Sequence, residues 1–420
     1  MGGRRSGRDG RNEALVVVFL TAARGREYSP FMIKRGIAGF VVLSLLVIAW
    51  APAPRLESAP KLRVVDLEGG TPYHMGLVHG RALKGEIREL VKRWKLDLEK
   101  VYGVPADEFI AEFLKKTDFK PAISRWTPGL LDEVRGIADA TGIDFDTMYA
   151  YQLIDELWAI GPDVMPAKCT TIAVGKRSGN PAYVAQTLDL PEFYHGYQTV
   201  LRVRDEKEDV EALVFTIPGV IAANGLNSRS VGVCVNAVTQ LAYSTKGLPV
   251  DFVIRGLLRQ KSYEQAVNFL ETVQPAAPQT YVIGGPNETA TFERSAKKMS
   301  RFVPFEGAEF SYHTNHPRIN DDYNPRFPEM LKAKDLTMEA YQAQCQRFSQ
   351  LSQALKDNSA VIDIDRLEAI FKNRNSGVNN ATTYGCTIMV LGESPELHVA
   401  AGRPDLAIFQ VVKFTPRKGR

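Results

Sequence analysis

Two patterns of apolar and polar residues divide the chain at about residue 168. Before it, apolar residues recur three and four positions apart, as in Ile87, Leu90 and Trp94, with charged residues between them. This spacing places the apolar side chains on one face of a helix. After it, short apolar runs rich in β-branched and aromatic residues end at Gly, Asn or Pro, which is typical of strands and turns.

The first pattern predicts a short strand at Leu62–Leu67 and then helices at Tyr73–Tyr102, Ala106–Lys116, Pro128–Thr141 and Asp146–Trp158. The second predicts strands at Thr199–Val203, Glu211–Ile217, Gly219–Ala223, Val231–Ala237, Thr280–Gly284, Ala290–Arg294, Thr382–Leu391, Glu396–Gly402 and Phe409–Phe414. Later helices are expected at Val250–Arg259, Tyr263–Val273, Pro325–Lys334, Met338–Lys356 and Ile364–Arg374. This order of elements indicates a layered α+β fold, with stacked sheets covered by helices.

The stretch around Cys169 predicts a β-hairpin. A turn of Ser, Gly, Asn and Pro separates two apolar runs, Ile172–Val174 and Ala182–Ala185. The hairpin would place Cys169 at the start of one strand and Asp189 just beyond the end of its partner, so that the thiol and the carboxylate lie at the same end. A nucleophile with a carboxylate beside it is a catalytic arrangement, although a lone cysteine at a strand start is more often a small buried hydrophobe.

The first sixty residues differ from the rest of the chain. Residues 1–31 are rich in Gly and Arg, which predicts a segment that is disordered or not translated. Residues 32–60 predict a signal peptide or membrane anchor followed by a proline-rich linker, because Lys34 and Arg35 precede an apolar run at 37–51. Pro follows each small-residue motif for signal-peptidase cleavage and should hinder the peptidase. An uncleaved membrane anchor through 37–51 is therefore the alternative to a signal peptide. We expect an exported protein, periplasmic or extracellular, and otherwise one anchored to the inner membrane.

Composition narrows the classes of function. The net charge is +4, and the first 35 residues hold seven arginines and one lysine against three acids, so the remaining chain is nearly neutral. Neither a basic surface nor a nucleic-acid-binding motif is present. Four cysteines at 169, 234, 345 and 386 are widely spaced, with no CxxC pair, so we expect neither a zinc cluster nor any other metal or cofactor.

The chain from Cys169 onward resembles the start of the mature chain in acyl-CoA:6-aminopenicillanic acid acyltransferases, the C45 peptidases. The resemblance rests on Cys169-Thr170-Thr171, the hairpin and the Q-x-x-D pattern of residues 186–189. That family lies among the N-terminal-nucleophile (Ntn) hydrolases. The resemblance implies a four-layer αββα sandwich with a helical N-terminal pro-segment at 61–168 and a catalytic segment at 169–420. It also implies self-cleavage between Lys168 and Cys169. The freed α-amino group, with an unperturbed pKa near 8, would then serve as the base for the thiol of the same residue.

The resemblance implies further site residues. Asp189 would orient the new amine, and Gln186 opens the same motif and would contact the substrate. Asn236 and Asn315 match the asparagines near the oxyanion, and Arg326 matches an arginine that supports the site. Simpler interpretations stand beside these: Asn236 capping a turn, Asn315 in a plain loop, and Arg326 paired with a nearby acid.

Two departures from the family pattern concern Lys168 and Gln186. The family more often has a small residue at the position of Lys168, and the bile-salt hydrolases have Arg where Gln186 falls. The expected activity is hydrolysis of a linear amide C–N bond, such as that of an N-acyl amino acid or a penicillin, or acyl transfer involving an acyl-CoA or amine. The alternatives are a papain-like thiol hydrolase that uses His195, His313 or His316, and a non-enzymatic envelope binding protein.

Overall fold

The structure is a computed structural model that describes residues 62–161, 168–177, 179–205, 209–356 and 361–415. The predictions for residues 1–31, and for the signal peptide or anchor with its linker at 32–60, lie outside these residues. Among the described helices, none combines the length and apolar character needed to cross a membrane.

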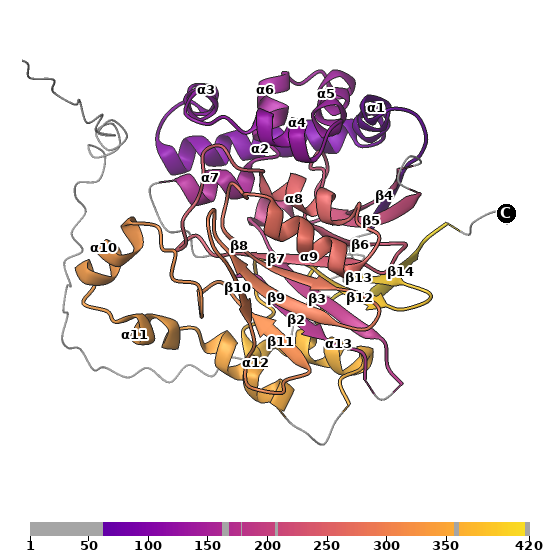
Figure 1. Ribbon diagram of the computed structural model, residues 1–420. Helices are drawn as coiled ribbons and strands as arrows, with labels where there is room; N and C mark the ends of the chain where they lie inside the picture. Colours follow the sequence, from indigo (N-terminus) through magenta and orange to yellow (C-terminus); the bar gives the residue numbers. More distant parts are fainter. Residues whose placement is uncertain (1–61, 162–167, 178, 206–208, 357–360, 416–420) are drawn as a thin grey trace, which may run out of the picture. The chain divides into compact units, whose positions relative to one another are not determined.

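Two β-sheets form the centre of the described chain (Figure 1). The first has the strand order β1-β4-β5-β6-β7-β8-β9-β10 and the second β11-β2-β3-β12-β13-β14. The strands of the first sheet are β1 (Arg63–Leu67), β4 (Thr199–Asp205), β5 (Val210–Thr216), β6 (Asn224–Asn227), β7 (Gly232–Ala237), β8 (Gln279–Gly284), β9 (Thr289–Arg294) and β10 (Met299–Phe302). Those of the second are β2 (Thr170–Val174), β3 (Ala182–Asp189), β11 (Phe310–His313), β12 (Thr383–Leu391), β13 (Glu396–Ala400) and β14 (Phe409–Lys413).

Helices lie on both sides of the two sheets (Figure 1). On the side of the first sheet are α1 (Pro72–Ala82), α2 (Lys84–Tyr102), α3 (Ala106–Lys115), α4 (Lys120–Trp126), α5 (Leu130–Thr141), α6 (Phe145–Ala150), α7 (Ile154–Ile160), α8 (Val250–Leu257) and α9 (Tyr263–Thr272). The later helices are α10 (Arg326–Ala333), α11 (Met338–Ala343), α12 (Gln346–Lys356) and α13 (Ile364–Lys372). Of these, α12 and α13 cover the outer face of the second sheet.

Side-chain alternation along β3 explains the layers. Val184 and Leu188 belong to the large core that includes the first sheet, whereas Tyr183 and Ala185 pack in a separate cluster with α12 and α13. Successive side chains of a strand point to opposite faces, so β3 has one apolar face toward the other sheet and one toward helices. The four-layer αββα architecture predicted from the resemblance is confirmed.

The packing of α1 against α5 depends on two glycines. A Cβ atom added at Gly76 would lie 1.9 Å from the carbonyl oxygen of Glu133, and one at Gly136 would lie 2.2 Å from that of Tyr73. Both distances are shorter than any real contact, so the two helices approach this closely only because neither residue has a side chain. The predicted end of α5 is also confirmed, because Gly142 follows it with a φ of 71°.

Three predicted helices are broken in the structure. The helix expected at 73–102 is α1 and α2, which meet at Leu83, where φ is −122° and ψ 26°. The one expected at 146–158 is α6 and α7, and the one expected at 338–356 is α11 and α12. The cap of α6 is Asp144, whose side chain accepts from the Thr147 backbone nitrogen, so the helix begins one residue before the predicted start at Asp146. Apolar spacing does not reveal such breaks, because it reports which residues are buried and not where the helix axis changes direction.

One strand prediction is wrong. The sequence predicts a strand at 219–223, but the strand is β6 at Asn224–Asn227, which consists largely of Asn and Gly, residues typical of turns. Asn227 donates its amide to the carbonyls of Leu258 and Gln260, at 2.9 and 2.7 Å. Gly225 lies so close to β5 that an added Cβ would be 2.3 Å from the carbonyl of Leu213. Residues typical of turns are used here for side-chain bonding and close packing.

Candidate active site

Cys169 lies directly before β2, at the end where β3 finishes. The ladder pairs Thr170 with Thr187, and the backbone nitrogen of Asp189 lies 3.5 Å from the Cys169 sulfur. The Cys169 residue is 7% exposed. The predicted hairpin and the common location of the thiol and Asp189 are therefore confirmed.

The uncut chain keeps the Cys169 thiol protonated. Burial and the nearby negative charge of Asp189 raise the pKa of Cys169 to about 12, although the Asp189 backbone N–H and the positive charge of Arg347 act in the opposite direction. A thiol is a weak nucleophile until it loses its proton. Chemistry at this sulfur therefore requires a base close by.

The Asp189 carboxyl group has one satisfied oxygen and one free oxygen. Oδ2 accepts from the Asn380 side-chain nitrogen at 2.6 Å. Oδ1 is buried and has no hydrogen-bond partner among the described residues. Burial raises the pKa of Asp189 to about 6, against the hydrogen bonds of Asn380 and Thr383 to the carboxyl group and the positive charges of Arg347 and Lys168. A buried oxygen without a partner is unfavourable, so this atom is suited to hold a donor that arrives later.

Arg347, on the first turn of α12, contacts the predicted cleavage site directly. Its Nη1 donates to the carbonyl oxygen of Lys168, to that of Cys169 at 2.9 Å and to Thr170 Oγ1 at 2.9 Å. Its Nη2 donates to Asn315 Oδ1 at 3.1 Å. A guanidinium is always charged and has several donors in a fixed plane, so it can hold a carbonyl oxygen and stabilise negative charge on it. No motif in the sequence singles out Arg347.

Asn236 contacts the start of β2 directly, and Asn315 is connected to it through Arg347. Asn315 donates its amide to the carbonyl of Ala237 at 3.0 Å and accepts from Arg347. Asn236 donates to Thr171 Oγ1 at 3.0 Å and to the carbonyl of His313 at 3.2 Å, so it links the two sheets. The structure thus brings both predicted asparagines near Cys169, and Arg347 connects Asn315 to the bond before it.

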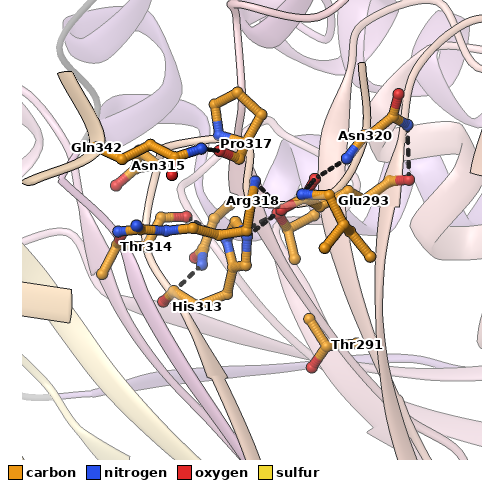
Figure 2. A network of polar contacts seen from close by, with 12 residues as sticks. Thr291, Glu293, His313, Thr314, Asn315, Pro317, Arg318, Asn320 and Gln342 are labelled. Carbon is orange, nitrogen blue, oxygen red and sulfur yellow. Dashed lines mark hydrogen bonds and ion pairs between the residues drawn. The ribbon is translucent and has the colours of Figure 1, made fainter. Parts of the chain in front are cut away.

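A buried network holds the loop that contains Asn315 (Figure 2). Glu293 accepts from His313 Nε2 at 2.8 Å and from the backbone nitrogens of Arg318, Ile319 and Asn320 at 2.6, 3.1 and 2.8 Å. Although burial opposes it, hydrogen bonding and the charge of His313 hold the pKa of Glu293 below its usual range. The network fixes both ends of the loop from His313 to Asn320, which orients Asn315 between them.

Two predicted site residues have other places in the structure. Gln186 donates its side chain to the carbonyl of Val235 and accepts from Asn224 at 2.8 Å, so it connects the sheets and lines neither hollow beside Cys169. Arg326 donates to the carbonyls of Ala159 and Gly161 at the end of α7. Arg347 rather than Arg326 reaches the predicted cleavage site, because the first turn of α12 lies beside β2 and that of α10 does not.

Two hollows meet beside Asp189. The outer hollow has a volume of about 330 Å³ and is lined mainly by apolar and aromatic side chains, among them Trp94, Leu98, Val101, Leu157 and Phe193. The inner hollow, of about 60 Å³, is lined by Cys169, Asp155, Asp251, Gln279 and several aliphatic residues. Ile154, Trp158, Asp189 and Leu190 line both. A cavity with apolar walls and a few convergent polar groups is typical of a small-molecule site.

Two stacked sheets between helices, with a cysteine beside an aspartate at the end of a strand, are the arrangement that the resemblance to the Ntn hydrolases implies. A family model confirms the particular resemblance: residues 212–392 match acyl-coenzyme A:6-aminopenicillanic acid acyl-transferase. This segment contains Asn236, Asn315 and Arg347 and begins after Cys169 and Asp189.

Individual relatives are distant. Protein dcd1B of Dictyostelium discoideum is 22% identical over 246 residues, which are 53% of this chain and 48% of the relative, so the match spans about half of that protein. Among solved structures, a Caenorhabditis elegans ortholog of N-acylethanolamine-hydrolyzing acid amidase has 16% identity and a TM-score of 0.39, covering 59% of this chain and all of that one. Penicillin V acylase from Agrobacterium tumefaciens has 11% identity and a TM-score of 0.35, covering 59% and 86%.

Proposed function

We propose that the chain cleaves its own peptide bond between Lys168 and Cys169 and then hydrolyses a linear amide with Cys169 as nucleophile. In the first step the Cys169 sulfur attacks the Lys168 carbonyl carbon. The carbon–nitrogen bond breaks, the thiol proton passes to the nitrogen, and water hydrolyses the resulting thioester. The contact of Arg347 with the Lys168 carbonyl supports this step, because negative charge develops on that oxygen.

The same residue then acts on substrate. The new α-amino group takes the proton of the Cys169 thiol, and the thiolate attacks the amide carbonyl of the substrate to form an acyl-enzyme. The departing amine takes a proton, and water releases the acid. Asp189 Oδ1, a buried acceptor with no partner in the described chain, would hold the new amine, because the backbone nitrogen of the same residue contacts the Cys169 sulfur. This free oxygen is the single observation that carries the proposal.

The outer hollow suggests the acyl half of the substrate. Its walls are mainly Trp, Leu, Val and Phe side chains, which favour an apolar chain or ring. We therefore propose amides with an apolar acyl group, the class to which N-acyl amino acids and penicillins belong. We propose water as the acceptor in preference to an amine or an acyl-CoA, because an exported enzyme works where water is always present. Export itself is proposed from residues 32–60 and is tested by cell fractionation and N-terminal sequencing of the secreted form.

Intact-mass spectrometry of the purified protein tests the proposal. We expect two fragments that meet between Lys168 and Cys169, and hydrolysis of N-acyl amides by the cleaved form. Cys169→Ala should give an uncut and inactive chain. An uncut chain that is nevertheless active, or a Cys169→Ala chain that still cleaves itself, would falsify the mechanism.

One observation supports the papain-like alternative at a different cysteine. His313 is fully engaged, because Nδ1 contacts Thr280 Oγ1 and the Thr314 carbonyl while Nε2 contacts Glu293. At Cys345, however, hydrogen bonds from His316 and Thr314 outweigh burial and lower the pKa to about 6. Cys345→Ala is therefore the matched control: it should keep both cleavage and activity, whereas loss of activity in this variant alone would favour the Cys345–His316 pair.

A further inference from the structure

The inner hollow contains polar atoms without partners. Asp251, in the first turn of α8, is 7% exposed and its carboxyl group has no hydrogen bond in the described part of the chain. Gln279, at the start of β8, is 1% exposed; it donates to Asp155 Oδ1 at 2.7 Å, and its own Oε1 is buried without a partner among the described residues. Both residues line the hollow, so the unpartnered acceptors belong to its wall. Unpartnered acceptors in a cavity wall are expected where a ligand supplies the donors.

The charges around this hollow are of one sign. Asp155, Asp189 and Asp251 line it, and the described lining residues include no Lys, Arg or His. Glu156 lies just behind, with Oε1 accepting from the Val250 nitrogen at 3.0 Å and Oε2 unpartnered. Burial raises the pKa of Asp155 to about 6, and burial with the neighbouring acids raises that of Asp251 well above its usual value. A cation in the hollow would supply the missing opposite charge.

We propose that the inner hollow is a subsite for a protonated amino group carried by the amine half of the substrate. The volume of about 60 Å³ suits a short aminoalkyl group and excludes a long acyl chain, which the apolar outer hollow accepts. The reactive carbonyl would lie between them, where Cys169 and Asp189 line the cavity. The inference rests on the proposed amide hydrolysis and specifies its substrate class: N-acyl diamines, with one nitrogen acylated and the other a free ammonium.

The subsite is separate from the groups that the reaction itself uses. The α-amino group of Cys169 would satisfy Asp189, as proposed above. That leaves Asp251 and the Gln279–Asp155 pair, on α8, β8 and α7, to bind substrate. Because these residues come from three helices and strands of one compact unit, we expect the subsite to be pre-formed.

A matched series of amides tests the proposal. Four substrates share one medium-length acyl chain and differ in the amine: 1,3-diaminopropane, 3-aminopropanol, butylamine and β-alanine. With the cleaved enzyme we expect kcat/KM for the diamine amide to exceed that of the butylamide by about tenfold or more. This ratio corresponds to the free energy of one charge-assisted hydrogen bond at a buried site. The carboxylate-bearing β-alanine amide should be the poorest, because its negative charge would be buried beside three acidic side chains with no cation in the lining.

Variants locate the effect. Asp251→Asn keeps the shape of the side chain and should reduce the preference for the diamine amide over the butylamide to about onefold, a ratio that a uniform loss of rate would not change. Asp155→Asn provides a second variant in case Asp251→Asn does not fold. Asp146→Asn is the control and should keep the preference. It removes an exposed carboxylate on α6 that pairs with Lys120.

The outcomes separate this inference from the proposed function. Hydrolysis of the neutral amides with no preference for the diamine, or a preference that both variants retain, overturns the subsite and leaves Cys169 hydrolysis standing. A higher rate with the hydroxyl amide than with the diamine amide also overturns it in favour of a neutral donor. A cleaved enzyme that hydrolyses no member of the series overturns both.

Discussion

The Cys169 sulfur and the Asp189 backbone nitrogen lie 3.5 Å apart, at the end of two neighbouring interior strands of the second sheet, β2 and β3. β2 and β3 are both buried along their full length, so neither strand end can move without disturbing the core. The thiol and the carboxyl group are thus held by the sheet itself. Such placement on rigid elements is what a reaction with strict geometry requires.

Asp189→Asn should abolish amide hydrolysis while leaving the fold intact. The amide is close in size to the carboxyl group, but it cannot bind the new α-amino group as an anion. Wild-type activity should fall as the pH drops through about 6, because protonation removes the same charge. The check is kcat/KM against pH for both proteins, using enzyme already shown by mass to be cleaved. An Asp189→Asn enzyme with a wild-type rate and pH profile would show that this carboxylate has no part in the reaction.

Arg347→Ala should slow self-cleavage by roughly a hundredfold, the effect of losing one donor to a developing oxyanion. Lysine keeps the charge and loses the planar fork, so Arg347→Lys should be intermediate. Arg326→Ala is the matched control, because its guanidinium contacts the carbonyls of Ala159 and Gly161. Time courses of precursor loss on gels measure the three rates. Equal rates for Arg347→Ala and wild type would remove Arg347 from the mechanism.

Asn315→Ala and Asn236→Ala should have different consequences. Asn315 lies in the loop next to Arg347, and its loss should lower kcat by about 10²-fold with little change in KM, as for an oxyanion donor. Asn236 connects β7 to Thr171 and His313 inside the core, so its loss should lower stability by about 1–3 kcal/mol. Kinetics and urea unfolding of both variants distinguish the roles. The reverse pattern would assign the oxyanion to Asn236.

The buried acids predict that the uncut chain is more stable in mild acid. The pKa of an unfolded Asp is about 3.9, whereas Asp155 and Asp189 have folded values of about 6. Their stabilising contribution is therefore present below about pH 4 and is lost as the pH rises through about 6, at about 2–3 kcal/mol each. The melting temperature of the Cys169→Ala chain should thus be higher at pH 5 than at pH 7.5. Replacing either Asp with Asn should reduce this difference, and an unchanged difference would contradict the raised pKa.

Gly136→Ala should destabilise the fold by about 1–3 kcal/mol or more, because the new methyl group overlaps the Tyr73 carbonyl of α1. Gly85→Ala on α2 is the control, since an added Cβ there meets nothing within 4 Å. Denaturant midpoints of the two variants give the comparison. Similar midpoints would mean that α1 and α5 can separate without cost.

Short-range features of the site could be predicted from the sequence. Cys169 and Asp189 belong to one hairpin, where the turn fixes which residues lie opposite each other. By contrast, Arg347 and Asn380 lie 179 and 191 positions along the chain from the groups they bind. Their neighbours carry only the ordinary pattern of a helix and a loop. Such contacts are set by how whole layers pack, and no local pattern contains that information.

Gln186 shows a second limit on what the sequence alone can predict about the site. A polar residue in an apolar strand suggests a binding role, and alternation gives the face on which it lies but not what that face meets. In a sandwich both faces are buried, and the inward one meets the other sheet, where Val235 and Asn224 satisfy the amide. The strand β6 was mispredicted for the same reason. Its Asn and Gly residues are typical of turns, and the groups they contact are far away in the sequence.

β1 pairs in parallel with β4, from Arg63 beside Thr199 to Leu67 beside Val203. This pairing has a consequence for the mature enzyme. A break before Cys169 would leave β1 on one polypeptide and β4 on the other, joined only by hydrogen bonds and shared core. Denaturation would then be a dissociation, and recovery would require two separate molecules to meet. The mature enzyme would therefore regain activity at a rate that depends on its concentration, whereas the Cys169→Ala precursor would refold at a rate independent of dilution.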